Sequence, residues 1–79
     1  LLETATEKAD LVVANILADV IIMLTKDIRR CMKENGLFLS SGIIQEKADS
    51  VIEELKKNKF EIIEIMKKGE WVAIVAKCS

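Results

Sequence analysis

The residue best suited to chemistry in this chain is Asn15, which follows the segment Asp10-Leu11-Val12-Val13-Ala14. The unbroken apolar run in this segment is typical of a strand buried on both faces of a parallel sheet. Open α/β sheets bind their ligands beyond the carboxyl ends of such strands. A carboxamide has one acceptor oxygen and two donor hydrogens, so it can orient a polar ligand without changing its own protonation state. Asn15 is therefore the first candidate site residue.

The residues after Asn15 predict a helix. Asn15 is also a favourable N-cap, and this plainer structural role is compatible with a site role. Asn35-Gly36 would end the helix, with glycine in the left-handed conformation. Apolar residues recur at helical spacing and predict one buried stripe, made of Leu17, Val20, Ile21, Leu24, Ile28 and Met32.

The remaining sequence predicts a β-α-β-α-β-β order. The second strand spans residues 37–41, and a helix from about Gln45 to Asn58 follows it. Because a helix connects the first two strands, they should be parallel. The last two strands, residues 60–66 and 71–77, are joined by a short loop and should form an antiparallel hairpin.

The two hairpin strands differ in polarity, and this difference predicts the order of the sheet. Residues 71–76 are apolar on both faces, which favours an inner position. The strand of residues 60–66 carries Glu61 on one face and Glu64 on the other, as an edge strand tolerates. The predicted spatial order is first, second, fourth, third.

Further candidate residues end the second strand at the same sheet edge as Asn15. Ser40, Ser41 and Gly42 are placed to line a pocket there, although a turn is the plainer interpretation. Trp71 is interpreted as a core or hairpin-packing aromatic.

Composition excludes several classes of function. Seventy-nine residues suffice for one small core, and a net charge of −1 gives no sign of nucleic-acid or membrane binding. No transmembrane span or signal peptide is visible. The chain has no histidine, and Cys31 and Cys78 lie far apart, so we expect no metal site and no Cys/His catalytic pair.

The first strand also predicts a missing partner. Residues 11–14 are apolar on both faces, yet no other predicted strand remains to pair with their outer edge. The chain begins with Leu1 rather than methionine, and we expect it to continue a longer protein. One alternative is that the first ten residues fold over this edge. Another is a non-enzymatic module that adds residues 11–14 to a partner's sheet.

Three segments carry a family resemblance. They are Asp10-Leu11-Val12-Val13-Ala14-Asn15-Ile16-Leu17-Ala18, Gly36-Leu37-Phe38-Leu39-Ser40-Ser41-Gly42-Ile43-Ile44 and Gly69-Glu70-Trp71-Val72-Ala73. In this order and at these separations they resemble the ribosomal protein L11 methyltransferase family, which belongs to the class I S-adenosylmethionine-dependent methyltransferases. The resemblance extends over residues 2–77.

The resemblance implies a cytoplasmic enzyme that transfers methyl groups from S-adenosylmethionine to lysine side chains and the N-terminal amine of a large-subunit ribosomal protein. The family's asparagine at the position of Asn15 contacts the methionyl end of the cofactor, close to the acceptor amine. This implies a catalytic and cofactor-binding role for Asn15. We expect substrate contacts from Ile16, Leu17, Ser41 and Gly42.

The resemblance also implies that residues 1–79 are the C-terminal part of a Rossmann-like catalytic domain. The glycine-rich turn and the acidic residue that hold the nucleoside would precede Leu1. The N-terminal cofactor-binding half of the domain would then be a partner missing from this chain, and the fragment alone should be inactive.

Methyl transfer explains why an asparagine suits this position. The reaction is an in-line displacement, and the enzyme has to aim an unprotonated amine lone pair at the methyl group. The oxygen of an amide can accept a hydrogen bond from the amine and orient it. Related enzymes use Asn-Pro-Pro-Tyr, whose ring can stabilise the cationic product. Asn15-Ile16-Leu17-Ala18 lacks this aromatic ring, so such stabilisation must come from elsewhere.

A class I methyltransferase acting on RNA or on a glutamine amide remains an alternative.

Overall fold

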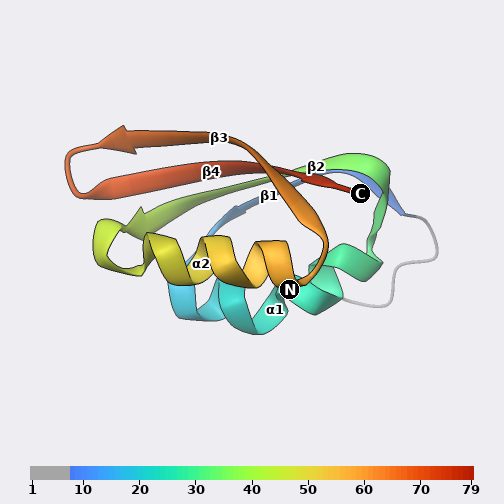
Figure 1. Cartoon of the computed structure of the whole chain (residues 1–79), viewed down its shortest axis with the longest axis horizontal. Helices are drawn as coiled ribbons and strands as arrows, with labels where there is room; N and C mark the ends of the chain where they lie inside the picture. The colour runs from blue at the N-terminus through green and yellow to red at the C-terminus, as the bar shows by residue number, and fades with distance from the viewer. Residues whose placement is uncertain (1–7) are drawn as a thin grey trace.

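The computed structural model describes residues 8–79, which form a two-layer α/β arrangement (Figure 1). One layer is a four-stranded sheet, and the other consists of two helices packed on one face of it. The elements in chain order are β1 (Ala9–Asn15), α1 (Ala18–Arg30), β2 (Met32–Ile44), α2 (Gln45–Lys57), β3 (Phe60–Lys68) and β4 (Trp71–Cys78).

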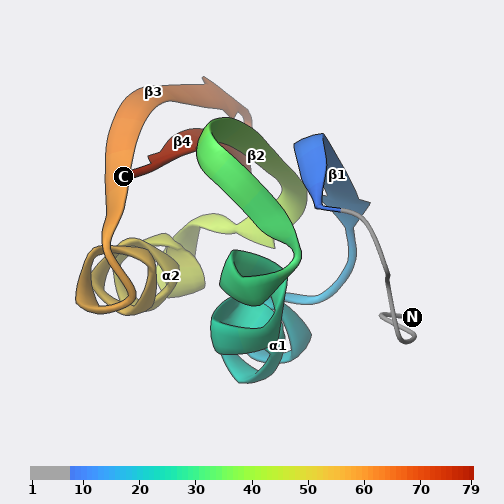
Figure 2. The same ribbon diagram turned by 90° about the vertical axis from the view of Figure 1, so that its right-hand side faces the viewer.

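The sheet has the order β1-β2-β4-β3, as predicted. β1 and β2 are parallel, and β4 is antiparallel to both β2 and β3. The α/β class, the β-α-β unit and the C-terminal hairpin are therefore confirmed. β1 and β3 form the two edges (Figure 2).

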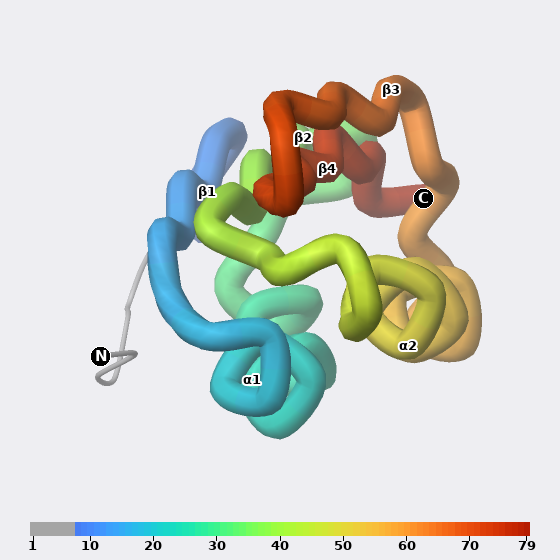
Figure 3. Tube along the Cα trace, turned by 90° about the vertical axis from the view of Figure 1, so that its left-hand side faces the viewer, coloured from blue at the N-terminus to red at the C-terminus, as the bar shows by residue number. Residues whose placement is uncertain are grey.

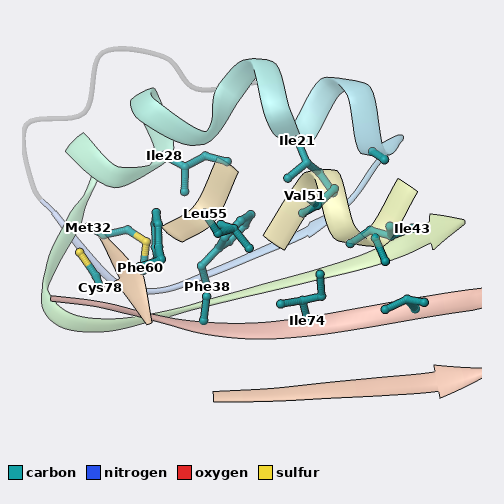
Figure 4. Close-up of a cluster of buried hydrophobic side chains, with 14 residues drawn as sticks. Ile21, Ile28, Met32, Phe38, Ile43, Val51, Leu55, Phe60, Ile74 and Cys78 are labelled. Atoms are coloured by element: carbon teal, nitrogen blue, oxygen red, sulfur yellow. The ribbon is translucent and has the colours of Figure 1, made fainter. Parts of the chain in front are cut away.

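The hydrophobic core lies between the sheet and the two helices (Figure 4). Alternate residues of each strand face the helices, because successive side chains point to opposite sides of a sheet. Phe38 of β2 is fully buried, and its ring lies 5.9 Å from that of Phe60. The other fully buried apolar side chains of this core include Ile21, Ile43, Val51, Leu55, Ile74 and Cys78.

Helix α1 begins later than predicted, so Asn15 is not its N-cap. The N-cap is Leu17, which makes no side-chain capping hydrogen bond, and Asn15 is the last residue of β1. Leu17 is extended and 73% exposed, so it does not belong to the buried stripe. Thr25 lies in that stripe instead, because its hydroxyl donates to the carbonyl oxygen of Ile21 (2.7 Å) and leaves no unpaired polar group.

The end of α1 also differs from the prediction. The helix ends at Arg30, and β2 begins at Met32. Asn35 rather than Gly36 takes the left-handed conformation (φ 66°), which asparagine tolerates better than most residues. A Cβ on Gly36 would lie 2.9 Å from the carbonyl oxygen of Lys33, so glycine is required here for close backbone approach.

The face of the sheet opposite the helices is covered by no helix within residues 8–79 (Figure 2). Leu11 and Val13 of β1 point to this outer face and are 58% and 60% exposed. Their exposure agrees with the prediction that residues 11–14 suit burial on both faces but lack a cover in this chain. Whether the first residues of the chain cover this edge concerns positions 1–7, which lie outside the described residues.

A bulge in β3 changes the predicted polarity of that strand. The register shifts between Ile62 and Glu64, so Glu61 pairs with Lys77 and Glu64 with Val75. Lys77 and Val75 lie two residues apart on the same face of β4, so both glutamates lie on the outer face. The prediction that they lie on opposite faces is wrong.

Neither of the described helices is long and apolar enough to cross a membrane.

Candidate functional site

The site is built where three strand ends meet at one end of the sheet (Figure 3). Asn15 ends β1 and pairs with Ser41, and Trp71 begins β4 opposite Ile44. The backbone N–H of Gln45 donates to the carbonyl oxygen of Glu70 (2.8 Å), which ties the hairpin turn to the start of α2. Parallel pairing of β1 with β2 therefore brings their carboxyl ends together, as predicted from sequence.

A hollow of about 440 Å³ lies at this end and is lined by Asn15, Ile16, Leu17, Gly42 and Trp71. Four of the five predicted site residues therefore line the same space. None of the lining side chains carries a charge, so a ligand group held here meets an amide, an indole ring and aliphatic side chains. Such a lining is typical of small-molecule sites, which combine apolar walls with a few polar groups.

Ser41, the fifth predicted residue, lines an adjoining hollow of about 180 Å³. This second hollow shares Gly42 and Trp71 with the first and continues along the hairpin past Met66 and Lys68. Ser41 thus lies near the Asn15 hollow but does not line it. Ser40 is fully buried in the core, and its hydroxyl points to the carbonyl oxygen of Ile74 (3.5 Å). It is excluded from the site because alternate residues of β2 face opposite sides.

Trp71 is the functional candidate that sequence reasoning missed. It is 54% exposed and lines both hollows, so of its two interpretations the core aromatic is wrong, whereas a place on the hairpin beside Met66 and Lys68 agrees with the structure. The apolar run of β4 suggested burial, but Trp71 alternates with the buried Val72 and Ile74 and therefore lies on the outer face, which no helix covers within residues 8–79. One signal was available in the sequence: a tryptophan directly after the turn residues Gly69-Glu70 is placed at a strand end.

Asn15 borders a further hollow of about 250 Å³ between β1 and α1, which it shares with Val12, Ile16 and Leu24 among others. Its side chain is exposed and makes no hydrogen bond to any of residues 8–79. None of residues 8–79 therefore competes with a ligand for the hydrogen-bonding groups of the carboxamide.

The chemistry that this arrangement permits is positioning rather than proton transfer. The 440 Å³ hollow has no carboxylate, lysine or cysteine in its lining that would act as a general base. The amide oxygen of Asn15 can accept a hydrogen bond, and the face of the Trp71 indole can attract a cation. Among residues 8–79, no group of three or more potential metal-ligating side chains lies together.

Comparison with known proteins shows the family to which this chain is related. The family model described as ribosomal protein L11 methyltransferase (PrmA) matches residues 1–79. The chain belongs to this family. It is 52% identical over 77 residues to the ribosomal protein L11 methyltransferase of Alkaliphilus oremlandii, covering 98% of this chain and 25% of that protein. It is 49% identical over 71 residues to that of Caldicellulosiruptor saccharolyticus, covering 90% of this chain and 24% of that protein.

A solved structure shows the same fold. The crystal structure of the ribosomal protein L11 methylase from Lactobacillus delbrueckii subsp. bulgaricus matches with a TM-score of 0.85 at 31% identity. The match covers 89% of this chain and 36% of that one. The resemblance that three sequence segments carry is thereby confirmed. This chain spans about a quarter of the length of the curated relatives that it matches.

Proposed function

We propose that this chain is the C-terminal, acceptor-side part of a methyltransferase that modifies ribosomal protein L11. Membership of the family supports the reaction and the substrate class. The observation that carries the proposal is the shared hollow of Asn15 and Trp71, which combines an aromatic face with an amide that makes no hydrogen bond to any of residues 8–79. A cytoplasmic location follows from this substrate.

The proposed acceptors are lysine side chains and the N-terminal amine of the substrate. Oδ1 of Asn15 accepts a hydrogen bond from the amine N–H and so directs the nitrogen lone pair along the line of attack. A neutral amide suits this task because it neither competes for the methyl group nor changes charge during transfer. The aliphatic side chains of Ile16 and Leu17 contact the methylene stem of an incoming lysine.

Trp71 supplies the aromatic group that is absent from Asn15-Ile16-Leu17-Ala18. Methylation of an amine produces an ammonium cation, and no anionic side chain lines the hollow to stabilise it. An indole face stabilises such a cation by roughly 0.5–2 kcal/mol, depending on how far water is excluded. A residue from β4 would thus perform the task that a tyrosine beside the asparagine performs in related enzymes.

The residues of this chain fit only one end of S-adenosylmethionine. Asn15 and the end of β1 would hold the methionyl part, since its amino and carboxylate groups require polar partners. When bound, this cofactor supplies an electrophilic methyl group. One exposed amide provides little of the binding free energy for a nucleoside of this size, so the 79 residues alone should bind it weakly and be inactive.

The other part of the catalytic domain would cover the exposed edge and outer face of the sheet. Among residues 8–79, β1 pairs with β2 alone, and Leu11 and Val13 are more than half exposed. The 250 Å³ hollow between β1 and α1 is lined almost entirely by apolar side chains. A preceding strand paired with β1 would bury these side chains and satisfy the free backbone groups of the edge.

The test uses a full-length protein that contains this chain, purified ribosomal protein L11 and S-adenosylmethionine with a labelled methyl group. We expect label on the amines of L11, and about a hundredfold lower kcat for Asn15→Ala with an unchanged melting temperature. Label on RNA or on a glutamine amide would overturn the acceptor assignment. Calorimetry should detect no micromolar binding of S-adenosylmethionine to the isolated 79 residues.

A further inference from the structure

We propose that Gly42 is a positioning residue whose missing side chain creates the space that holds the carboxamide of Asn15. Its importance for methyl transfer rests on the proposed function of Asn15, whereas the positioning itself does not. Gly42 follows Ser41, the residue that pairs with Asn15 across β1 and β2. The two residues therefore lie beside each other at the end of the sheet.

One atom of Asn15 occupies the space beside Gly42. A Cβ added to Gly42 would lie 2.3 Å from Oδ1 of Asn15, far inside van der Waals contact. The next nearest atoms, Cγ of Asn15 and the carbonyl oxygen of Ile16, would lie at 3.6 and 3.9 Å, which are ordinary distances. The amide oxygen alone thus occupies the place where any other residue would carry its side chain.

No hydrogen bond to residues 8–79 fixes the side chain of Asn15. Asn15 is exposed, and its carboxamide makes no hydrogen bond to the described residues. An unrestrained asparagine on a strand populates several rotamers. The space at Gly42 accommodates the rotamer that lays Oδ1 against the backbone of β2, at the wall of the 440 Å³ hollow.

A methyl group at position 42 would move Asn15 and leave the fold intact. The only atom in conflict is the far end of a flexible side chain, so rotation about the side-chain torsions of Asn15 relieves the clash. The strands do not have to separate. Gly42→Ala would therefore displace the amide oxygen by more than an ångström, and an error of this size at a reacting group lowers rates by about a hundredfold.

The backbone gives Gly42 a second constraint, which the experiment has to separate from the first. Its φ of 75° lies in the left-handed region, so alanine is strained there regardless of Asn15. Gly69 provides a matched control because its φ is 60° and a Cβ would meet no atom within 4 Å. Gly69→Ala carries the same kind of strain without the clash.

The experiment compares Gly42→Ala with Gly69→Ala in a full-length protein that contains this chain. We expect both variants to lower the melting temperature by similar amounts. Only Gly42→Ala should lower kcat, by about a hundredfold with little change in KM for ribosomal protein L11. A crystal structure of Gly42→Ala should show the carboxamide of Asn15 in a different rotamer.

A double-mutant cycle with Asn15→Ala tests whether Gly42 acts through Asn15. If it does, adding Gly42→Ala to Asn15→Ala lowers kcat by less than twofold further. The proposal is overturned if Gly42→Ala retains the kcat of Gly69→Ala, if the cycle is additive, or if the carboxamide does not move. A moved carboxamide together with full activity of Asn15→Ala would support the positioning and overturn the catalytic role of Asn15.

Discussion

The same strands make both faces of the sheet, but apolar side chains are buried on the inner face and exposed on the outer face. On the inner face, Phe38 and Ile74 are fully buried beneath α1 and α2. On the outer face, Leu11 and Val13 remain more than half exposed, although they are equally apolar. The outer face also leads directly to Asn15, which lies two residues beyond Val13 on the same side of β1.

The difference separates stability from function. The inner face is a finished core that this chain makes from its own residues. The outer face is apolar at Leu11, Val13 and Leu37 but carries Glu61 and Glu64 on β3, and no helix covers it within residues 8–79. Exposed apolar area of this kind marks an interaction surface. The face of the sheet that stabilises the fold is therefore opposite the face that would bind other groups.

The largest expected effect comes from the inner face. Phe38→Ala should lower the free energy of unfolding by about 3–5 kcal/mol, because it removes a fully buried ring and leaves a cavity beside Phe60. Leu37→Ala is the matched control on the outer face, where Leu37 is 40% exposed, and should cost about 1 kcal/mol. Urea denaturation measures both. Equal losses of stability would mean that Leu37 on the outer face is as important for folding as Phe38 on the inner face.

A smaller effect, on activity alone, is expected at the site. Asn15→Ala should raise the barrier to methyl transfer by about 2.7 kcal/mol, which corresponds to a hundredfold lower kcat. Ser40→Ala serves as the inner-face counterpart, since Ser40 is buried beside Ile74. It should lower stability by about 1 kcal/mol and leave kcat unchanged. The opposite pattern, with Ser40 controlling kcat, would remove Asn15 from the catalytic role.

Trp71 should give an effect of similar kind but smaller size. Trp71→Leu keeps an apolar side chain and removes the aromatic face, so we expect a loss of about 0.5–2 kcal/mol in binding of a methylated lysine peptide. Trp71→Phe should recover part of the affinity. Fluorescence or calorimetric titration of a full-length protein that contains this chain measures the peptide. If Trp71→Leu binds as tightly as the original protein, the cation contact does not exist.

The outer face yields the prediction that depends most on context. Val13→Thr replaces a methyl group with a hydroxyl at nearly constant volume. In the isolated chain, where Val13 is 60% exposed, the free energy of unfolding should change by less than about 0.5 kcal/mol. In a full-length protein, where we expect this residue to be covered, the loss should reach about 1–2 kcal/mol. The same small value in both proteins would argue against a cover.

The smallest effect is expected from the ion pair that links the two helices near the site. Lys47 lies 2.9 Å from the carboxylate of Asp19, but both side chains are about half or more exposed. Lys47→Met should therefore cost less than about 1 kcal/mol, and the loss should fall as salt is added. A large loss that salt does not reduce would show that this contact is structural.

Much of the fold could be predicted because local patterns specify it directly. The helix between the first two strands requires parallel pairing, and the short Gly69-Glu70 turn requires a hairpin. The two glutamates of residues 60–66 led to the correct edge strand, although both lie on the outer face rather than on opposite faces. The ends of α1 could not be predicted this way, because Asn15 and the pair Asn35-Gly36 favour helix ends but do not compel them. Pairing of Asn15 with Ser41 extends β1 to that residue instead.

The candidate site was predictable only in part for a related reason. The sequence indicated Asn15 because it is a polar residue at the end of an apolar strand. It indicated Ile16 and Leu17 because they follow Asn15, and Ser41 and Gly42 because they end the neighbouring strand. It did not identify Trp71, since an aromatic in an apolar strand is usually buried. Its exposure depends on which face of β4 the two helices cover, and an apolar run does not specify that face.

The sequence alone determined the order and type of the elements, the family and the position of the asparagine, because these depend on periodicity and on residues close in the chain. Only the tertiary structure decided that Trp71 shares a hollow with Asn15, that Ser40 turns into the core, and that the amide oxygen lies where Gly42 has no side chain. These depend on the register between strands, and a shift of one residue would exchange the two faces.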